Sequence, residues 1–449
     1  MTNKLTPARE CYAVVISCRE IDRFDHNRVF IDEMKVAFAK VGLPLRPVDY
    51  RSDPRALTKA LMDSNCVFAI CFNGFGSEVS VVGPRPGSLR SAFEAFGKPL
   101  FDYFHDNPSQ ETMGHQVEST TRFRHVLFTD YGYLAEGLDL GFPNVRYIPS
   151  ITFPTHLSKP LRPLRDRPIP LLLSVGLTSP DWISKRHDAR PTYRGAAYRA
   201  VYEAVLEACV HNLRKDPRVE VRNACREAGL HFDVRTADSR FLLTSTVDMV
   251  KVKRRSLLLE KLRGFPLTIL SDNPDAAYDD GHNRVGAAKF DGVLDAMAQS
   301  RVVLCPLPHM TGFHERALGA FSAKSLVVSA PNDVLETNFE FGSEFLQYES
   351  IDELCDILLS IEKNLDLGQE IANAGHERAM AQFSPGRFAA TVISLWRVAS
   401  RSWCGKDDAI GCFSQGERAR SSRSGGHASE EASELRASAE PAGSKIGTN

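Results

Sequence analysis

The sequence lacks the marks of several large protein classes. Its ten cysteines form no C-x-x-C pair, which argues against a zinc ribbon and a thioredoxin-type redox site. No stretch approaches the roughly 18 consecutive apolar residues of a membrane helix, and the N-terminus lacks the apolar core of a signal peptide. Cys66, Cys71 and Cys305 lie inside apolar runs, where a reduced thiol packs as a small hydrophobe. We therefore expect a cytoplasmic protein with no transmembrane segment.

Net charge is also nearly absent. The 449 residues include 55 lysines and arginines against 56 aspartates and glutamates, so the formal net charge is −1. This balance gives no support for nucleic acid as a partner bound through general positive charge. A hydrophobic content of 43% and a charged content of 25% are typical of globular proteins. The length predicts at least two domains.

Common catalytic motifs are missing as well. There is no G-x-S-x-G elbow for serine hydrolysis and no phosphate loop for nucleotide hydrolysis. The H-E-x-x-H zinc motif is absent, because His314-Glu315 is followed by Arg316, Ala317 and Leu318. The stretch 73–77 contains only a partial G-x-G, which disfavours a Rossmann dehydrogenase and fits an ordinary turn.

Short apolar runs alternate with helical patterns along the first half of the chain. The runs span residues 12–17, 67–72, 100–104, 125–129 and 145–148. This alternation predicts β-α-β units and a parallel sheet, with chemistry at the carboxyl ends of the strands. His105 and Asp106 directly follow one run, which makes them candidates for a catalytic base, with His115 as a third.

A proline-dense segment then separates the two halves. We expect an N-terminal domain over residues 1–155, a linker over 156–168, a second α/β domain over 169–400 and a disordered tail over 401–449. Residues 193–263 are predicted to be mostly helical, and the charge block at Lys251, Lys253, Arg254 and Arg255 is interpreted as a solvated helix face. A further helix is expected from 285 to 298, and helices again over 351–363, 367–383 and 387–399.

The stretch 300–332 combines two strand-like runs with a helix expected from about Phe313 to Lys324. His314, Glu315 and Arg316 fall in the first turn of that helix, where free N–H groups and the positive dipole end favour a phosphate. Arg316 can neutralise phosphate charge, and Glu315 can accept hydrogen bonds from sugar hydroxyls. The pattern therefore predicts a diphosphate site, with an ordinary solvated first turn as the alternative.

The same residues resemble a known family. The second half is similar to the C-terminal domain of GT-B glycosyltransferases, in particular the group 1 glycosyl transferases related to CgeB. The family motif H-E-R-x-x-x-A-M-A-x-G corresponds to residues 314–324, and N-x-x-L-E-x-x-F corresponds to residues 332–339. Residues 375–378, Gly-His-Glu-Arg, resemble the G-x-E-R of a late helix in that family. The resemblance is loose over residues 67–385 and close over 300–380.

This resemblance implies an α/β, GT-B-like fold, in which two Rossmann-like domains face a cleft. It implies transfer of a sugar from a nucleotide-diphosphate sugar to an unknown glycan, lipid or protein acceptor, with no cofactor and no metal. Asp106 and His105 would lie on the acceptor side, and the donor would be bound by Gly176, Thr178, Gly312, His314, Glu315 and Arg316. A sugar-nucleotide epimerase of the same fold and a non-catalytic nucleotide-sugar or glycan-binding protein are the alternatives.

Phe321 stands where the family pattern has its usual methionine. Two further positions depart from the pattern in ways that bear on the site. Ala323 stands where an E-x7-E pattern would place its second carboxylate, which favours the non-catalytic alternative. Lys324 replaces a glycine. It either adds a phosphate contact or is an exposed helix end stabilised by the dipole, and we favour the second interpretation.

Overall fold

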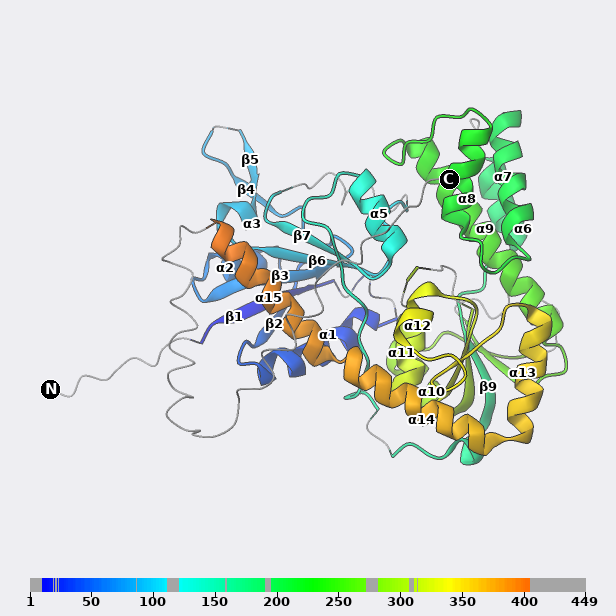
Figure 1. Cartoon of the computed structure of the whole chain (residues 1–449). Helices are drawn as coiled ribbons and strands as arrows, with labels where there is room; N and C mark the ends of the chain where they lie inside the picture. The colour runs from blue at the N-terminus through cyan, green and yellow to red at the C-terminus, as the bar shows by residue number, and fades with distance from the viewer. Residues whose placement is uncertain are drawn as a thin grey trace, which may run out of the picture. The chain divides into compact units, whose positions relative to one another are not determined.

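The computed structural model describes residues 10–18, 20, 22, 24–85, 87–110, 121–157, 160–189, 195–271, 282–306, 311–312 and 314–403. The candidate base His115 and residues 404–449 of the predicted tail lie outside these ranges. Residues 1–396 form one compact unit and residues 397–449 a second, of which only 397–403 are described. The first unit holds two six-stranded sheets with helices around them (Figure 1), so the expected α/β fold with two Rossmann-like sheets is confirmed.

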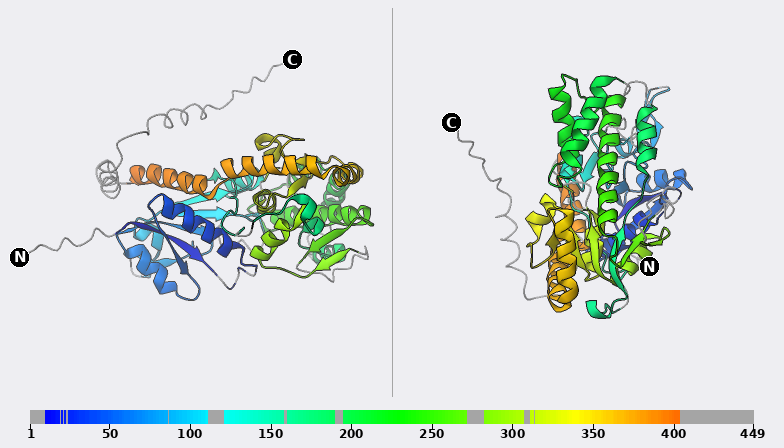
Figure 2. Two further views of the ribbon diagram at one scale, coloured as in Figure 1. Left: turned by 90° about the horizontal axis from the view of Figure 1, so that it is seen from below. Right: turned by 90° about the vertical axis from the view of Figure 1, so that its right-hand side faces the viewer.

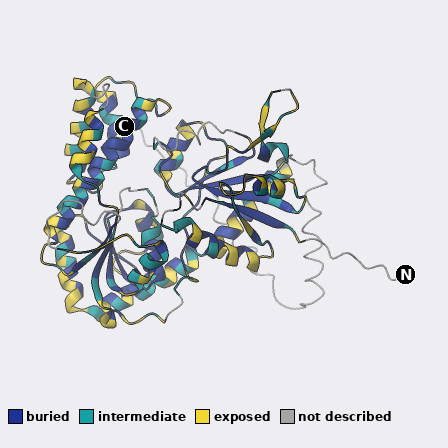
Figure 3. Ribbon diagram, turned by 180° about the vertical axis from the view of Figure 1, so that it is seen from behind, coloured by how far each residue is buried: buried dark blue, intermediate teal, exposed yellow. Residues whose placement is uncertain are grey.

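The first sheet has the strand order β2-β1-β3-β6-β7-β8, and every neighbouring pair is parallel. Its strands are β1 (Tyr12–Ser17), β2 (Leu45–Asp49), β3 (Cys66–Phe72), β6 (Leu100–Phe104), β7 (Arg124–Phe128) and β8 (Arg146–Tyr147). The accompanying elements are α1 (His26–Lys40), α2 (Pro54–Met62), the hairpin β4 (Ser80–Val82) and β5 (Leu89–Ser91), α3 (Ala92–Ala95) and α5 (Tyr131–Asp139). The central strands β1, β3, β6 and β7 are mostly buried and the outer helix faces exposed (Figure 3), as in a parallel sheet covered on both faces.

The second sheet has the order β11-β10-β9-β12-β13-β14 and is also parallel throughout. Its strands are β9 (Ile169–Ser174), β10 (Leu267–Leu270), β11 (Asn283–Val285), β12 (Ser300–Cys305), β13 (Leu326–Ser329) and β14 (Leu346–Gln347). The helical elements up to β10 are η2 (Leu164–Asp166), α6 (Pro180–Asp188), α7 (Ala196–Cys209), α8 (Pro217–Glu227) and α9 (Ala237–Lys261). Those that follow are α10 (Phe290–Ala298), α11 (Glu315–Ser322), α12 (Asp333–Asn338), α13 (Ile351–Lys363), α14 (Leu365–Gln382) and α15 (Pro385–Trp403).

One predicted helix start was wrong. Val285 ends strand β11, and the helix begins only at Phe290, because residues 286–289 form the connection between strand and helix. Other elements also escaped prediction, among them strand β2 and the hairpin of β4 and β5. Strand β2 reads LRPVD, and its proline is tolerated because the strand lies at the sheet edge. The hairpin β4–β5 is too short and too exposed to give an apolar run.

Apolar contacts link the two halves of the first compact unit. One buried cluster contains Phe128 and Val126 of the first sheet together with Val205 of α7 and Val247 of α9. The three long helices between β9 and β10 therefore share a core with the first sheet. A separate cluster fills the second sheet and includes Leu173, Leu304 and Val328. The parallel strands of the second half therefore share a hydrophobic core of their own.

The last two helices run one after the other (Figure 2) and pack on different sheets. Helix α14 contacts β13 and α11 in the second half. On α15 the ring of Phe388 lies 5.7 Å from that of Phe30 and 5.3 Å from that of Tyr103, and Trp396 lies 5.9 Å from Phe68. Helix α15 thus returns to the first sheet, although the predicted range 169–400 assigned it to the second domain.

Candidate functional site

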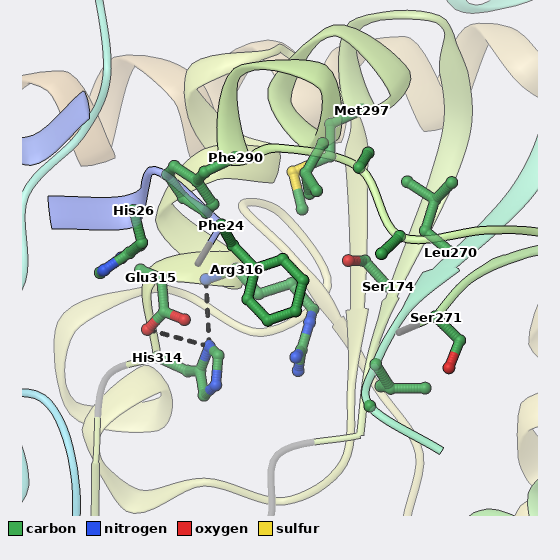
Figure 4. A pocket seen from close by; sticks show the side chains of 15 residues that line it. Phe24, His26, Ser174, Leu270, Ser271, Phe290, Met297, His314, Glu315 and Arg316 are labelled. Atoms are coloured by element: carbon green, nitrogen blue, oxygen red, sulfur yellow. Dashed lines mark hydrogen bonds and ion pairs between the residues drawn. The ribbon is translucent and has the colours of Figure 1, made fainter. Parts of the chain in front are cut away.

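A pocket of about 230 Å³ lies at the carboxyl edge of the second sheet (Figure 4). Part of its wall is formed by residues at and beyond the ends of β9 and β10, including Gly176 and Ser271, and another part by the start of α11. Phe290 of α10 and His26 of α1 complete it. The volume is below the roughly 300–1,000 Å³ of a complete small-molecule site. The pocket therefore suits one portion of a larger ligand.

His314 begins helix α11 as its N-cap. Its Nδ1 accepts a hydrogen bond from the backbone N–H of Arg316 at 3.2 Å (Figure 4). Burial, which outweighs the opposing effect of Glu315, lowers the pKa of His314 to about 4. The imidazole is therefore neutral near pH 7, and its proton sits on Nε2, since Nδ1 acts as an acceptor. A neutral cap leaves the positive end of the helix free for an anion.

Glu315 and Arg316 both line the pocket. Burial alone would raise the pKa of Glu315, but His314, His26 and Arg316 lower it to about 2, so this carboxylate is ionised. The Nη1 atom of Arg316 is buried and has no hydrogen-bond partner among the described residues. A buried guanidinium nitrogen without an acceptor is costly, and it marks a place where an anionic group of a ligand would bind.

A buried arginine holds the glycine loop after β9. Arg255 of α9 donates from Nη1 to the carbonyl oxygen of Gly176, and the backbone N–H of Leu177 donates to Ser271 Oγ at 3.2 Å. Arg254 donates to the carbonyl oxygens of three residues, among them Cys209 at 2.8 Å. The prediction of a solvated basic face was therefore wrong for these two arginines, because both are tied to the backbone.

The remaining two residues of that predicted basic face behave differently. Lys253 is exposed, as expected. Lys251 is partly buried and pairs with Asp248, three residues earlier on the same helix, at 2.7 Å. Lys253 is thus solvated, whereas Arg254 and Arg255 hold backbone carbonyl groups. The spacing of these residues along the helix does not distinguish the two roles.

Of the six predicted donor-side residues, four line the pocket: Gly176, His314, Glu315 and Arg316. Thr178 and Gly312 are not among its lining residues. Gly312 instead forms a bridge with Asp130, and its carbonyl oxygen accepts from Asn332 Nδ2 at 2.9 Å. The donor-binding roles stay predictions, and Gly312 has a packing role in addition.

Asp130 is the centre of a buried hydrogen-bond network that includes Thr311, shortly before the start of α11. Its Oδ1 accepts from Arg218 Nη1 at 3.0 Å and from Thr311 Oγ1 at 3.0 Å. Arg218 Nη2 also donates to Thr311 Oγ1 at 2.7 Å, and the backbone N–H of Tyr131 donates to the carbonyl oxygen of Thr311 at 3.0 Å. The network joins the end of β7, the start of α8 and residues 311–312, and so fixes a point just before α11.

Two of the departures from the family pattern lie at the far end of α11. Ala323 is fully buried, and its carbonyl oxygen accepts from Arg167 Nη2 at 3.0 Å. Lys324 has a positive φ of 51°, the left-handed conformation that glycine adopts most readily. Neither residue lines the pocket. The left-handed backbone gives a physical reason why a glycine is the natural residue at position 324.

His105 and Asp106 follow β6, and both are organised by Asn73. The Oδ1 atom of Asn73 accepts from the backbone N–H groups of His105 at 2.9 Å and Asp106 at 3.2 Å, and its Nδ2 donates to Asp106 Oδ2 at 2.8 Å. Asn73 has a φ of 49°, and turn hydrogen bonds follow from Phe75 to Phe72 and from Ser77 to Gly74. The partial G-x-G is thus a turn that also presents the predicted acceptor-side residues.

The surroundings of His105 and Asp106 shift the pKa values of the two side chains in opposite directions. Burial lowers the pKa of His105 well below its usual value, and its ring packs against those of Phe72 and Tyr103. Partial desolvation of its carboxylate, followed by the negative charge of Glu315, raises the pKa of Asp106, although the residue as a whole is exposed. The coupling to Glu315 shows that the predicted acceptor-side and donor-side residues share one electrostatic environment.

His26 is a pocket residue that the sequence gave no reason to select. It is the first residue of α1, and its ring lies 4.9 Å from that of His105 and 4.7 Å from that of Phe290. The only usable signal was its position at a helix start after the first strand, in a loop at the carboxyl edge of the sheet.

The described residues contain no cluster of three or more His, Cys, Asp or Glu side chains that could hold a metal ion. In that same part of the chain, no helix combines the length and the apolar character needed to cross a bilayer.

Comparison with known proteins places this geometry in a class. Residues 254–394 match a family described as glycosyl transferase-like. HepE of Anabaena, in complex with UDP and glucose, is 11% identical with a TM-score of 0.43, over 86% of this chain and 100% of HepE. Sucrose-phosphate synthase from Thermosynechococcus elongatus is 11% identical with a TM-score of 0.47, over 87% of this chain and 100% of the synthase.

A third solved structure is an alpha-glucosyltransferase in complex with UDP and a 13-mer DNA, 9% identical with a TM-score of 0.44, over 86% of this chain and 99% of that enzyme. No curated protein matches the sequence. Residues 254–394 therefore form a glycosyl transferase-like region, in a chain that contains two parallel six-stranded sheets. The family resemblance expected from residues 314–339 is confirmed by that match.

Proposed function

We propose that this protein transfers a sugar from a nucleotide-diphosphate sugar to an acceptor, and that the pocket at the start of α11 binds the diphosphate. The observation that carries the proposal is Arg316, whose Nη1 is buried at the pocket and has no hydrogen-bond partner within the described part of the chain. The neutral cap of His314 leaves the helix dipole and the first N–H groups available to the same anion. The match of residues 254–394 to the glycosyl transferase-like family supports the reaction class.

In the proposed reaction, the bond between the anomeric carbon and the β-phosphate oxygen breaks, and its electron pair leaves with the nucleoside diphosphate. A new bond forms between the anomeric carbon and an acceptor oxygen, whose proton passes to a base. Arg316 and the N–H groups of α11 stabilise the charge that develops on the leaving diphosphate. They do so without a metal ion in this proposal. The ionised Glu315 accepts hydrogen bonds from sugar hydroxyls.

We assign the base to Asp106 and a positioning role to His105. Asp106 is an exposed residue whose carboxylate has a raised pKa, so it is a better proton acceptor than an ordinary aspartate. The Nε2 of His105 is buried and lies within an aromatic cluster that includes Phe72 and Tyr103, so its reach toward an acceptor is limited. The acceptor, whether a glycan, a lipid or a protein, is left open by this assignment.

The direct test is turnover of a panel of donors: UDP-glucose, UDP-N-acetylglucosamine, GDP-mannose and dTDP-glucose. Steady release of free nucleoside diphosphate, with water or an added acceptor taking the sugar, supports the proposal. Binding without turnover for every donor and every acceptor would instead favour a non-catalytic nucleotide-sugar-binding protein. Conversion of one bound sugar into its isomer would favour the epimerase.

The role of Arg316 is tested by calorimetric titration with UDP, or with the nucleotide of the donor that turns over. Arg316→Gln should weaken binding roughly 10- to 100-fold, since a hydrogen bond to a charged group contributes about 1.5–3 kcal/mol. Arg55→Gln, at an exposed position on α2, is the matched control and should bind normally. Unchanged affinity in Arg316→Gln would mean that the diphosphate does not bind in this pocket.

A further inference from the structure

We propose that His26 is a further residue of this active site and that its ring contacts the sugar being transferred. The inference rests on the proposed function and deepens it, because it names the group of the substrate that His26 meets. His26 lines the same pocket as Arg316 and Glu315, yet it comes from α1, in the other half of the chain.

The first observation is an unsatisfied ring nitrogen. The Nε2 of His26 is buried and has no hydrogen-bond partner among the described residues. The ring is packed edge to face against the rings of His105 and Phe290, with interplanar angles of 81° and 80°. These aromatic contacts orient the imidazole plane but give Nε2 no hydrogen-bond partner. A buried polar atom in such a position calls for a partner, which the described residues do not supply.

The second observation is location. His26 interacts electrostatically with Glu315 and His314, which belong to the proposed donor side, and with His105 and Asp106, which belong to the proposed acceptor side. The transferred sugar must lie between the departing diphosphate and the acceptor base. His26 therefore occupies the region that the sugar would enter.

The chemistry of the ring also favours the sugar over the diphosphate. A sugar hydroxyl can both donate and accept a hydrogen bond, so it can pair with the Nε2 of His26 whether that nitrogen carries a hydrogen or a lone pair. A phosphate oxygen could only accept. The anion already has Arg316 and the start of α11 as its proposed partners.

Three contacts and a left-handed residue define the backbone around His26. Asp25 precedes it with a φ of 56°, a left-handed conformation that is uncommon outside glycine. Asp25 pairs with Lys289 at 2.9 Å, Arg28 pairs with Asp291 at 2.8 Å, and the backbone N–H of Phe290 donates to the carbonyl oxygen of Phe24 at 2.7 Å. These contacts dock the segment 24–28 onto the start of α10 and hold the ring in a set place, as a substrate contact requires.

The test compares His26→Phe with the wild-type protein, using the donor of the panel that turns over. Phenylalanine keeps the aromatic packing and removes both nitrogens. We expect kcat for donor turnover to fall roughly tenfold or more, as for one lost hydrogen bond to the reacting group, while the Kd for UDP, or for the nucleotide of that donor, stays within about twofold. His211→Phe, at an exposed position just after α7, is the control and should retain wild-type kcat. His26→Gln, which restores an N–H near the position of Nε2, should recover part of the lost rate.

A wild-type kcat in His26→Phe would overturn the inference, and so would a loss of nucleotide affinity that matches the loss of rate, since that would mean a structural or phosphate-binding role. If His26→Phe fails to fold, the intact protein provides a second measurement. The ring ¹⁵N resonance of His26, assigned by its disappearance in His26→Gln, should shift with the nucleotide-sugar and not with the nucleoside diphosphate alone. An equal shift with both, or none, contradicts the proposal. Absence of turnover in the wild-type protein with every donor overturns the proposed function itself, and this inference with it.

Discussion

The Nδ1 atom of His314 accepts the backbone N–H of Arg316 at 3.2 Å, so the residue that caps helix α11 does so only while its ring is neutral. The same Nδ1 lies 3.2 Å from Glu315 Oε2. Because Nδ1 carries no proton while it accepts this hydrogen bond, its contact with the Glu315 carboxylate is not an ion pair. The start of α11 is therefore a pH-sensitive element of the proposed donor site.

The first prediction concerns acid. Because the pKa of His314 falls from an ordinary 6.5 to about 4 in the folded protein, folding disfavours its proton. The stabilisation is complete above about pH 6.5 and is lost as the pH falls toward 4. His314→Asn keeps a capping side chain and has no such titration, so its Tm should decline less than that of the wild type between pH 7 and 4.5. His211→Asn serves as the control; a parallel decline in His314→Asn and wild type would contradict the prediction.

The cap itself shows what the sequence could and could not predict. Spacing of apolar residues and the dipole argument were enough to select His314, Glu315 and Arg316 as a helix start. The low pKa of His314 depends first on burial and then on electrostatic contributions, among them those of His26 and Arg255, which are distant in the chain. Such tertiary contacts leave no local pattern to read.

A second prediction tests the anchoring of the glycine loop. Arg255→Met keeps most of the side-chain volume but removes the donor to the carbonyl oxygen of Gly176. We expect a Tm decrease and a fall in donor turnover of roughly tenfold, since loss of a charged donor costs about 1.5–3 kcal/mol. Lys253→Met, at an exposed position two residues away, is the matched control. Equal behaviour of the two variants would show that the anchor is dispensable.

A third prediction uses the close approach of Gly312 to Asp130. A Cβ at position 312 would stand 2.2 Å from Asp130 Oδ2, so Gly312→Ala must displace the carboxylate that holds Arg218 and Thr311. We expect destabilisation of about 1–3 kcal/mol, as for other overpacked sites, together with weaker nucleotide binding. In the control Gly286→Ala, the added methyl group meets open space. Thermal unfolding and UDP titration measure both effects, and a neutral Gly312→Ala would refute the packing argument.

A fourth prediction addresses the left-handed residue at the end of α11. Lys324→Gly should raise the stability by about 0.5–1 kcal/mol, because glycine adopts a φ of 51° without the steric cost of a Cβ. Nucleotide affinity should not change, since position 324 lies outside the pocket lining. Lys253→Gly, inside helix α9, should instead lose about 1 kcal/mol. A clear loss of affinity in Lys324→Gly would revive the phosphate-contact interpretation.

The same contrast between local pattern and distant contact holds for the fold. The buried strands β3, β9, β12 and β13 were predictable because parallel strands covered on both faces read as continuous apolar runs. Strand β2 was not, because Arg46 and Pro47 interrupt its pattern at a sheet edge. The basic residues of α9 could not be sorted in advance, since the acceptors of Arg254 and Arg255 lie on segments far away in the chain.

The return of α15 to the first sheet also has a consequence during synthesis on the ribosome. The last strand of that sheet ends at Tyr147, but Phe30, Phe68 and Tyr103 receive their partners Phe388 and Trp396 only when the C-terminal helix has been translated. Until then an aromatic surface of the nascent chain has no cover, and exposed apolar surface of this kind promotes aggregation and chaperone binding. A segment translated early is thus completed by one translated much later, which makes the intervening second sheet a prerequisite for the finished core of the first.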